Sequence, residues 1–323
     1  MKFDEENIKK LKEILEKKDN FLIMGHKKPD GDSIGSVLGL SLALRGKGKK
    51  VTSCTIDPIT DPYLYLPKTY LIRQEIGSLD KFDVVIILDC GDRKMTGYHK
   101  DFPDLFSNKR EVINIDHHIS NDSFGTLNIV NSEASSTTHI IYYLLKKLGL
   151  TITSEIATHL LTGIYYDTGS FKHDNTTGDV LGVAADLSRL GAKGDLIGRK
   201  LFNNYTIDTL HLWGKIFQNL KQNKKGIVSG FVRDIDFEEC NLKAENVNFS
   251  QLMNYVDGVP NTKFSVLLAE NNGTIRGSFR TSDKHVDVSK IAGLFNGGGH
   301  KKAAGFVMKG KIQDVEGKLN VQE

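Results

Sequence analysis

The stretch that decides the fold is FLIMGHKKPDGDSIGSVLGLSLALRG, residues 21–46. Its first four residues are apolar and precede a polar loop, which is typical of a short strand buried in a sheet. Apolar side chains then recur at helical spacing as far as Gly46, at Ile34, Val37, Leu38 and Leu42. A strand, a polar loop and a helix in this order predict one unit of a parallel sheet.

The same alternation continues along the first half of the chain. Short, mostly β-favouring apolar runs occupy residues 51–56, 84–88 and 112–115. Helical patterns follow at residues 140–149, 156–164, 180–190 and 210–220. This order predicts an α/β fold, with a parallel sheet that carries helices on both faces.

A second, smaller domain is indicated by the length of 323 residues and by a hairpin signal. An Asn-Asn-Gly turn at residues 271–273 separates two strand patterns, because Asn and Gly tolerate the positive φ angles of a tight turn. The polar, lysine-rich residues 221–226 are typical of a boundary. We therefore expect three parts: an α/β domain, a helical linker and an α+β domain over residues 1–195, 196–225 and 226–323.

Composition narrows the classes of function. No run of about 18 apolar residues occurs, and the N-terminus lacks a secretory signal pattern, so we expect a cytoplasmic protein without a membrane partner. Three scattered cysteines, Cys54, Cys90 and Cys240, fit buried free thiols in a reducing compartment. A net charge of +3 is too small for a binder of long duplex nucleic acid. The oligomeric state stays open between a monomer and a homodimer.

Four polar clusters follow predicted strands or a helix, where open parallel sheets place their ligand sites. They occupy residues 26–32, 89–92, 116–118 and 167–170. Taken singly, each has an ordinary structural explanation: an Asp-Gly-Asp sequence is commonly a turn, and an aspartate at a strand or helix end is commonly a cap. Their recurrence after separate apolar segments favours a shared site.

Divalent cations would offset the repulsion among the carboxylates of such a site. Two ions balance four aspartates, with two histidines as neutral ligands: Asp30, Asp32, Asp89 and Asp167, with His26 and His117. Asp89 is the natural carboxylate to bridge the ions. Two adjacent ions suit phosphoester hydrolysis, since they polarise a phosphate and stabilise both the attacking and the leaving oxygen.

Residues 26–36, with Asp89, residues 116–118 and Asp167, resemble the signature of the DHH phosphoesterases. The resemblance implies a parallel α/β catalytic domain and two metal ions, usually Mn²⁺. The first ion would be held by His26, Asp30 and Asp89. The second would be held by Asp32, Asp89, His117 and Asp167. From the residues alone, a mixed imidazole and carboxylate set would also accept iron, cobalt or zinc.

The resemblance also assigns the remaining members of the Asp-His-His cluster. His118 would face the substrate, as a catalytic residue that donates a proton or a hydrogen bond to phosphate. A histidine that only supports the metal ligands is the alternative. Asp116 would lie behind the ligands and orient a neighbouring imidazole.

The C-terminal region resembles the DHH-associated domain of the nano-RNase group, on residues 276–281, 286–289 and a GGGH run at 297–300. By that resemblance Arg280 and His300 contact substrate phosphate or base. A glycine run lets backbone amides approach an anion closely, so Gly297, Gly298 and Gly299 are expected to cradle a phosphate. A flexible turn is the alternative for the glycines.

The resemblance therefore implies a two-metal phosphodiesterase and phosphatase of the nano-RNase and pAp phosphatase group. We expect substrates of about two to five nucleotides, since the small net charge attracts long polyanions weakly. pAp, 3′-phosphoadenosine 5′-phosphate, is the second expected substrate. A phosphodiesterase acting on cyclic dinucleotides or on pApA is the alternative, and a non-catalytic nucleotide-binding protein is a further one.

Overall fold

The computed structural model describes residues 1–106, 110–202, 205–247, 249–315 and 318–322, and these form two compact units, Met1–Asn204 and Tyr205–Glu323. The first unit contains a six-stranded sheet of order β3-β2-β1-β4-β5-β6, in which every neighbouring pair is parallel. Its strands are β1 (Asn20–Met24), β2 (Lys50–Cys54), β3 (Ile72–Arg73), β4 (Val84–Leu88), β5 (Glu111–Asp116) and β6 (Leu127–Val130). The predicted parallel α/β fold is confirmed.

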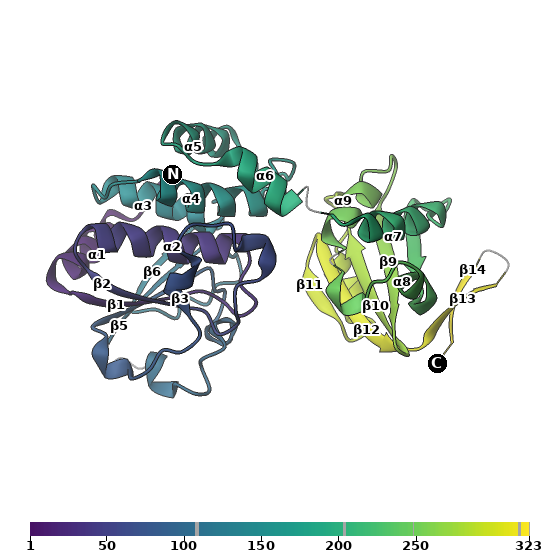
Figure 1. The fold of residues 1–323 in the computed structure, drawn as a ribbon, viewed down its shortest axis with the longest axis horizontal. Coiled ribbons are helices and arrows are strands. Elements are labelled where there is room, and N and C mark those ends of the chain that lie inside the picture. The colour runs from purple at the N-terminus through teal and green to yellow at the C-terminus, as the bar shows by residue number, and fades with distance from the viewer. Residues whose placement is uncertain (107–109, 203–204, 248, 316–317, 323) are drawn as a thin grey trace. The chain divides into compact units, whose positions relative to one another are not determined.

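The α-helices of this unit cover one face of the sheet (Figure 1). Four of them share a core with Phe21, Ile23 and Ile86 of the central strands: α1 (Glu5–Lys17), α2 (Gly31–Gly46), α3 (Thr137–Lys147) and α4 (Ser154–Asp167). Two more, α5 (Gly178–Arg189) and α6 (Gly194–Phe202), pack on α4. Among the described helices, none combines the length and apolar character that crossing a bilayer requires.

The opposite face of the sheet is covered differently. Leu22, Met24 and Val85 pack there against loops and short 3₁₀ helices. These are η3 (Leu79–Lys81), η4 (Arg93–Thr96) and η5 (Pro103–Phe106), while η1 (Asp61–Tyr63) and η2 (Thr69–Leu71) follow β2. Both faces thus carry helices, as expected, but only one face carries α-helices.

The second unit is an α+β domain around a six-stranded sheet of order β11-β12-β10-β9-β8-β7. Only β8 and β9 are parallel in it. Its strands are β7 (Lys221–Gln222), β8 (Ile227–Val232), β9 (Phe264–Asn271), β10 (Thr274–Arg280), β11 (Gly298–His300) and β12 (Ala303–Lys309), beside a separate hairpin of β13 (Lys311–Val315) and β14 (Lys318–Gln322). The predicted hairpin is confirmed, with φ of 49° at Asn272 and 80° at Gly273.

Helices pack on both faces of this second sheet. Helices α7 (Ile207–Gln218) and α9 (Ser250–Asp257) share a core with Leu267 and Ala269 of β9. Helix α10 (Val288–Gly293) packs with Phe279 of β10 and Phe306 of β12, which lie on the opposite face. The remaining helical segments are α8 (Asp234–Glu239) and η6 (Ala244–Asn246).

The helical segment 196–225 is divided between the two units. Helix α6 packs in the first unit, whereas α7 contributes Leu212, Trp213 and Ile216 to the core of the second. The lysine-rich residues 221–226 include β7, an edge strand that pairs with β8. Lysine on an edge strand discourages pairing with another chain, which explains a composition that resembles a linker in the sequence.

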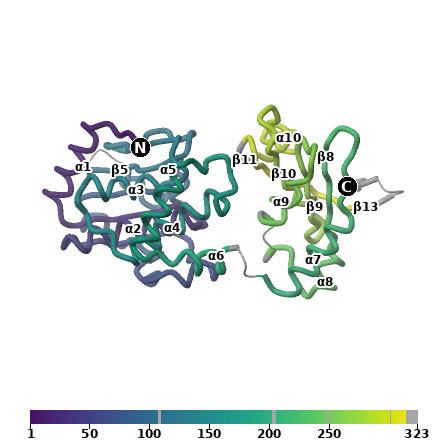
Figure 2. Tube along the Cα trace, turned by 90° about the horizontal axis from the view of Figure 1, so that it is seen from above, coloured from purple at the N-terminus to yellow at the C-terminus, as the bar shows by residue number. Residues whose placement is uncertain are grey.

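Glycines allow α2 and α4 to pack closely, side by side (Figure 2). A Cβ atom added at Gly35 of α2 would lie 2.4 Å from the backbone oxygen of His159 in α4. One added at Gly163 of α4 would lie 2.3 Å from the hydroxyl of Thr138 in α3. The glycines thus let α4 come into backbone-to-backbone contact with α2 and into close contact with the Thr138 side chain of α3.

We predict that Gly35→Ala lowers the free energy of unfolding by about 1–3 kcal/mol, because the new methyl group must push α2 away from α4. Urea denaturation followed by circular dichroism measures the loss. Gly182→Ala is the matched control, since Gly182 is an exposed helical residue of α5 with open space around its Cβ position. This control should raise stability by up to about 1 kcal/mol. Equal effects of both changes would contradict the packing argument.

Candidate metal centre

The polar clusters meet at the carboxyl edge of the first sheet. Strands β1, β4 and β5 are neighbours in it, and each is followed by one cluster. Asp89 comes directly after β4, and Asp116 is the last residue of β5. Asp167, the last residue of α4, joins them from the helical layer. Parallel strands that end at one edge explain why segments distant in sequence converge.

Asp89 lies at the centre of the site and is 2% exposed. Its φ of 59° is left-handed, a conformation that aspartate tolerates better than most residues. The carboxylate lies between two imidazoles: Oδ2 is 3.4 Å from Nε2 of His26, and Oδ1 is 3.7 Å from Nε2 of His117. Its two oxygens thus face two different histidines.

Besides a group that joins Asp89, His117 and His118, two groups of potential metal ligands flank this carboxylate. In the first, Nε2 of His26 lies 3.6 Å from Oδ1 of Asp30, and both residues group with Asp89. In the second, Nε2 of His117 lies 3.3 Å from Oδ2 of Asp167, and both group with Asp32. Within each group the ligand atoms lie no more than 4.8 Å apart. The structure thus brings together all six residues named as metal ligands from the sequence.

Asp32 is held by the N-terminus of α3. Its carboxylate accepts hydrogen bonds from the backbone amides of Thr137 (2.6 Å) and Thr138 (2.9 Å), and from the hydroxyl of Thr138 (2.7 Å). The hydroxyl of Thr137 donates to Oδ1 of Asp89 at 3.1 Å. Amides of a first helical turn have no partner within the helix and favour a negative charge. Thr137 and Thr138 therefore fix both carboxylate oxygens of Asp32 and one carboxylate oxygen of Asp89.

The sequence analysis missed Thr137 and Thr138. A signal was present, since Ser135, Ser136 and both threonines are residues of the type that caps helices, and they directly precede a helical pattern. The partner was not readable, because Asp32 lies 105 residues before Thr137.

Asp116 is fully buried and contacts the backbone and side chains around it. Its Oδ1 lies 2.7 Å from Nδ1 of His118 and accepts the backbone amide of His117 at 2.8 Å. Its Oδ2 accepts the side-chain amide of Asn121 at 2.6 Å. The carboxylate thus fixes the orientation of the His118 ring, which also lies near Asp89. The sequence analysis did not single out Asn121.

The pKa values show how strongly these groups interact. Burial, with the charge of Asp89 next, raises the pKa of Asp32 well above its usual range. Burial, with the charge of Asp32 next, does the same for Asp167. Burial would also raise the pKa of Asp89, but the histidines around it, His26 first, lower it overall. Because these buried carboxylates repel one another when they are ionised, a bound cation would stabilise their charged forms.

The neighbouring carboxylates also shift the pKa values of the histidines. Burial lowers the pKa of His26, but hydrogen bonds to Asp30 and Asp89 raise it to about 11. For His118, burial lowers the pKa and the hydrogen bond to Asp116 raises it, to about 9. Burial lowers the pKa of His117 and favours its neutral form.

These residues could hold a metal ion. In the described part of the chain, no lysine or arginine forms an ion pair with Asp30, Asp32, Asp89 or Asp167, so the protein itself supplies little positive charge besides histidine. Carboxylate oxygens and imidazole nitrogens form the ligand set that divalent transition ions prefer. The chemistry of the donors and their spacing therefore fit such an ion.

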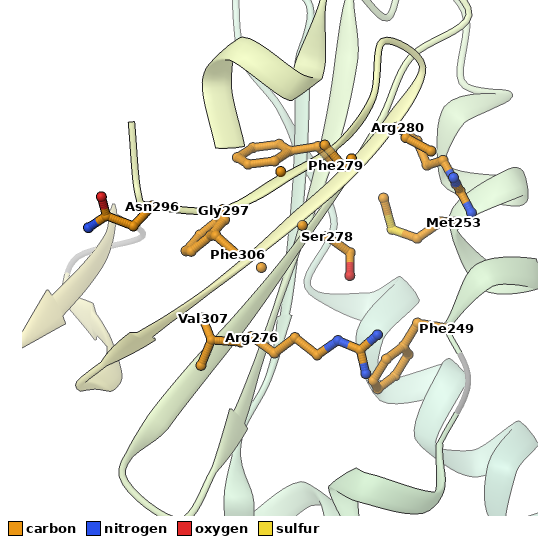
Figure 3. A pocket seen from close by; sticks show the side chains of 16 residues that line it. Phe249, Met253, Arg276, Ser278, Phe279, Arg280, Asn296, Gly297, Phe306 and Val307 are labelled. Carbon is orange, nitrogen blue, oxygen red and sulfur yellow. The ribbon is translucent and has the colours of Figure 1, made fainter. Parts of the chain in front are cut away.

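The predicted substrate-binding residues belong to the second unit. A cavity of about 580 Å³ there is lined by Arg280 of β10 and by Gly297, Gly298 and Gly299, among others (Figure 3). A Cβ atom at Gly298 would meet nothing within 4 Å, so its backbone borders open space. The side chain of His300 lies outside the described residues. A volume of this size accommodates a small ligand such as a nucleotide.

Comparisons with known proteins agree with this division. The model of the DHH family, N-terminal domain, matches residues 20–164, and that of the DHHA1 domain matches residues 223–320. The chain is similar to the bifunctional oligoribonuclease and PAP phosphatase NrnA of Thermus thermophilus, at 33% identity over 89% of this chain and 84% of the relative. The NrnA protein of Bacillus subtilis is 27% identical, over 89% and 88%.

A solved structure is similar over both units. It is that of an exopolyphosphatase-related protein from Bacteroides fragilis, with a TM-score of 0.86 and 26% sequence identity. The similarity covers 94% of this chain and 91% of that one. The fold described above is therefore shared with an experimentally determined protein.

We predict that Thr138→Val weakens Mn²⁺ binding by about tenfold or more, because Asp32 loses a hydroxyl donor that orients it, and such supporting contacts typically contribute 10- to 100-fold. Isothermal titration calorimetry on the full chain measures the change. Thr162→Val is the matched control: Thr162 is equally buried, but its hydroxyl donates to the backbone of its own helix. Equal affinities of the two variants would refute a positioning role for Thr138.

Proposed function

The chain belongs to the DHH family and carries a DHHA1 domain, and from this we propose that it hydrolyses short oligoribonucleotides and removes the 3′-phosphate of pAp. The observation that carries the proposal is the coexistence of a complete ligand cluster in the first unit with an arginine- and glycine-lined cavity in the second. Relatives that match along most of their length are named for these two activities. A complete set of ligands argues against a non-catalytic nucleotide-binding protein.

We propose that the cluster holds two divalent ions, which we assign as Mn²⁺. The first would be bound by His26, Asp30 and Asp89, and the second by Asp32, Asp89, His117 and Asp167. The separate grouping of the ligands on either side of Asp89, whose two oxygens face different histidines, supports this division. When bound, such ions polarise the scissile phosphate and stabilise the charge that develops on its oxygens.

The protein residues around the ions would orient the substrate. His118 is the residue that we assign to the scissile phosphate, because Asp116 accepts its Nδ1 proton at 2.7 Å and thereby leaves Nε2 as the nitrogen for that contact. Asp116 is itself held by Asn121, so the ring direction is determined by two successive hydrogen bonds. Thr137 and Thr138 hold Asp89 and Asp32 in place.

Residues of the second unit would select the substrate. We assign to Arg280 a phosphate contact, since a guanidinium group recognises phosphate through paired hydrogen bonds. The backbone amides of Gly298 and Gly299 would add neutral donors along the same cavity, whereas the amide of Gly297, which also lines it, already donates to the backbone oxygen of Ala292 at 2.9 Å. We also assign to His300 a contact with substrate phosphate or base, as the family resemblance implies.

A substrate panel in the presence of Mn²⁺ tests the proposal. It contains a dinucleotide, a pentanucleotide, long single-stranded RNA, pAp, pApA, cyclic di-AMP and pyrophosphate. We expect the short oligonucleotides and pAp to be hydrolysed fastest. Pyrophosphate as the best substrate would contradict the proposal, and equal rates on long RNA and the dinucleotide would contradict the preference for short substrates. Cyclic di-AMP or pApA as the best substrate would favour the cyclic-dinucleotide pathway of hydrolysis instead.

We predict that Asp89→Asn abolishes hydrolysis of every substrate, because both proposed ions lose the charge of the carboxylate between them. The loss should be on the order of a thousandfold, which corresponds to roughly 4 kcal/mol. Asparagine keeps the shape and the left-handed backbone, so circular dichroism should be unchanged. The exposed Asp122→Asn is the control and should keep full activity. More than a tenth of parental activity in Asp89→Asn, with full metal content, would refute the assignment.

We predict that Arg280→Ala separates substrate selection from chemistry. The value of kcat/KM for a dinucleotide should fall about ten- to a hundredfold, as expected for a charge-assisted hydrogen bond worth roughly 1.5–3 kcal/mol. A small chromogenic phosphodiester needs only the ions and should react at nearly the parental rate. Arg233→Ala, an arginine of the same unit that does not line the cavity, is the control. Equal losses on both substrates would place Arg280 at the reacting phosphate.

A further inference from the structure

The cavity of the second unit exists because one sheet face is only partly covered. Helix α9 packs over β9, through Leu252, Met253 and Val256, and reaches β10, whereas α7 packs over β8. Helix α10 packs on the other face, against Phe279 and Phe306. The face of β10, β12 and β11 beside α9 therefore lines the cavity, together with Phe249 and Met253 (Figure 3).

Alternation along β10 places three polar residues on this face. Arg276, Ser278 and Arg280 are partly or fully exposed, whereas the residues between them are buried. Ser278 pairs with Gly305 of β12, which pairs with Gly298 of β11. The middle of the cavity floor thus carries no side chain larger than a hydroxymethyl group, and an arginine stands on each side of it.

Arg276 has no acidic partner among the residues that the structure describes. Its cross-strand neighbours are Ala269 and Val307, which are apolar. Within the described residues, no carboxylate lies at ion-pairing distance from its guanidinium group. Figure 3 shows this group directed toward the ring of Phe249, another residue of the cavity wall. An anion in the cavity would meet this charge.

The spacing of the two arginines gives two anion positions. Four residues of extended strand separate their Cα atoms by roughly 14 Å, at about 3.4 Å per residue. Both side chains leave the same face of β10, so they lie along one groove. The groove therefore offers a cation, a neutral stretch of floor and a second cation, and this order complements a nucleoside flanked by two phosphates.

We propose that Arg276 is a residue that determines substrate length, by holding the phosphate next to the one held by Arg280. The nucleoside between these phosphates would lie over Ser278, Gly305 and Gly298. This inference rests on the proposed function. pAp has one phosphate besides the scissile one, enough for a single arginine, whereas a 5′-phosphorylated trinucleotide has two, enough for both. Arg276 therefore favours the oligonucleotide over pAp.

Steady-state kinetics on Arg276→Ala with Mn²⁺ test this inference. KM for the 5′-phosphorylated trinucleotide should rise about tenfold with kcat unchanged, because a binding contact away from the reacting phosphate is lost. Both constants for pAp should stay within about twofold of the parental values. Arg276→Lys should recover part of the loss, since it keeps the charge but not the planar fork.

Lys309→Ala is the matched control, because Lys309 is an exposed cation of the same sheet that does not line the cavity. It should leave both substrates unaffected. Equal effects of Arg276→Ala on the two substrates, no effect on either, or an equal effect of Lys309→Ala would overturn the inference. Fluorescence anisotropy with a labelled trinucleotide reports the same contact without turnover. A parent enzyme that hydrolyses neither substrate, yet binds the trinucleotide through Arg276, would refute only the proposed function.

Discussion

The mutual repulsion of four aspartates at one edge of a parallel sheet is the constraint on which the first unit depends. Asp32 and Asp89 are buried, and Asp30 and Asp167 are only partly exposed, so water screens their charges poorly. Among the described residues, hydrogen-bond donors rather than lysine or arginine offset this repulsion. Histidines surround Asp89, and the first turn of α3 donates to Asp32. This arrangement leaves charge for metal ions to balance.

The packing of the helices serves the same constraint. Asp32 begins α2, its donors begin α3, and Asp167 ends α4, so the positions of three helices set the ligand distances. Gly35 and Gly163 keep these helices in close contact, and a shift of a few tenths of an ångström would pass directly to the carboxylates. Stability and ligand geometry therefore rest on the same contacts.

On the proposed function, the second unit would meet a different requirement, the recognition of a short anionic substrate by a protein of small net charge. It concentrates charge on one strand, where Arg276 and Arg280 share a face, and keeps the floor between them free of large side chains. A protein can thus bind a short anionic chain without the extended basic surface that long nucleic acid requires. On this proposal, chemistry and selection would depend on different residues and could be altered separately.

The sequence by itself determined the elements and their order, because strand and helix patterns and turn preferences are local properties. The strands around residues 21–24, 84–88 and 112–115, the hairpin at 271–273 and the polar clusters after strands were all readable, and the cluster order matched a known family. The edge strands β3 and β6 are short and gave no such pattern. Only the tertiary structure decided that Thr137 and Thr138 hold Asp32, and that Arg276 shares a cavity with Phe249. These contacts join segments far apart in the chain, and packing rather than local preference brings such segments together.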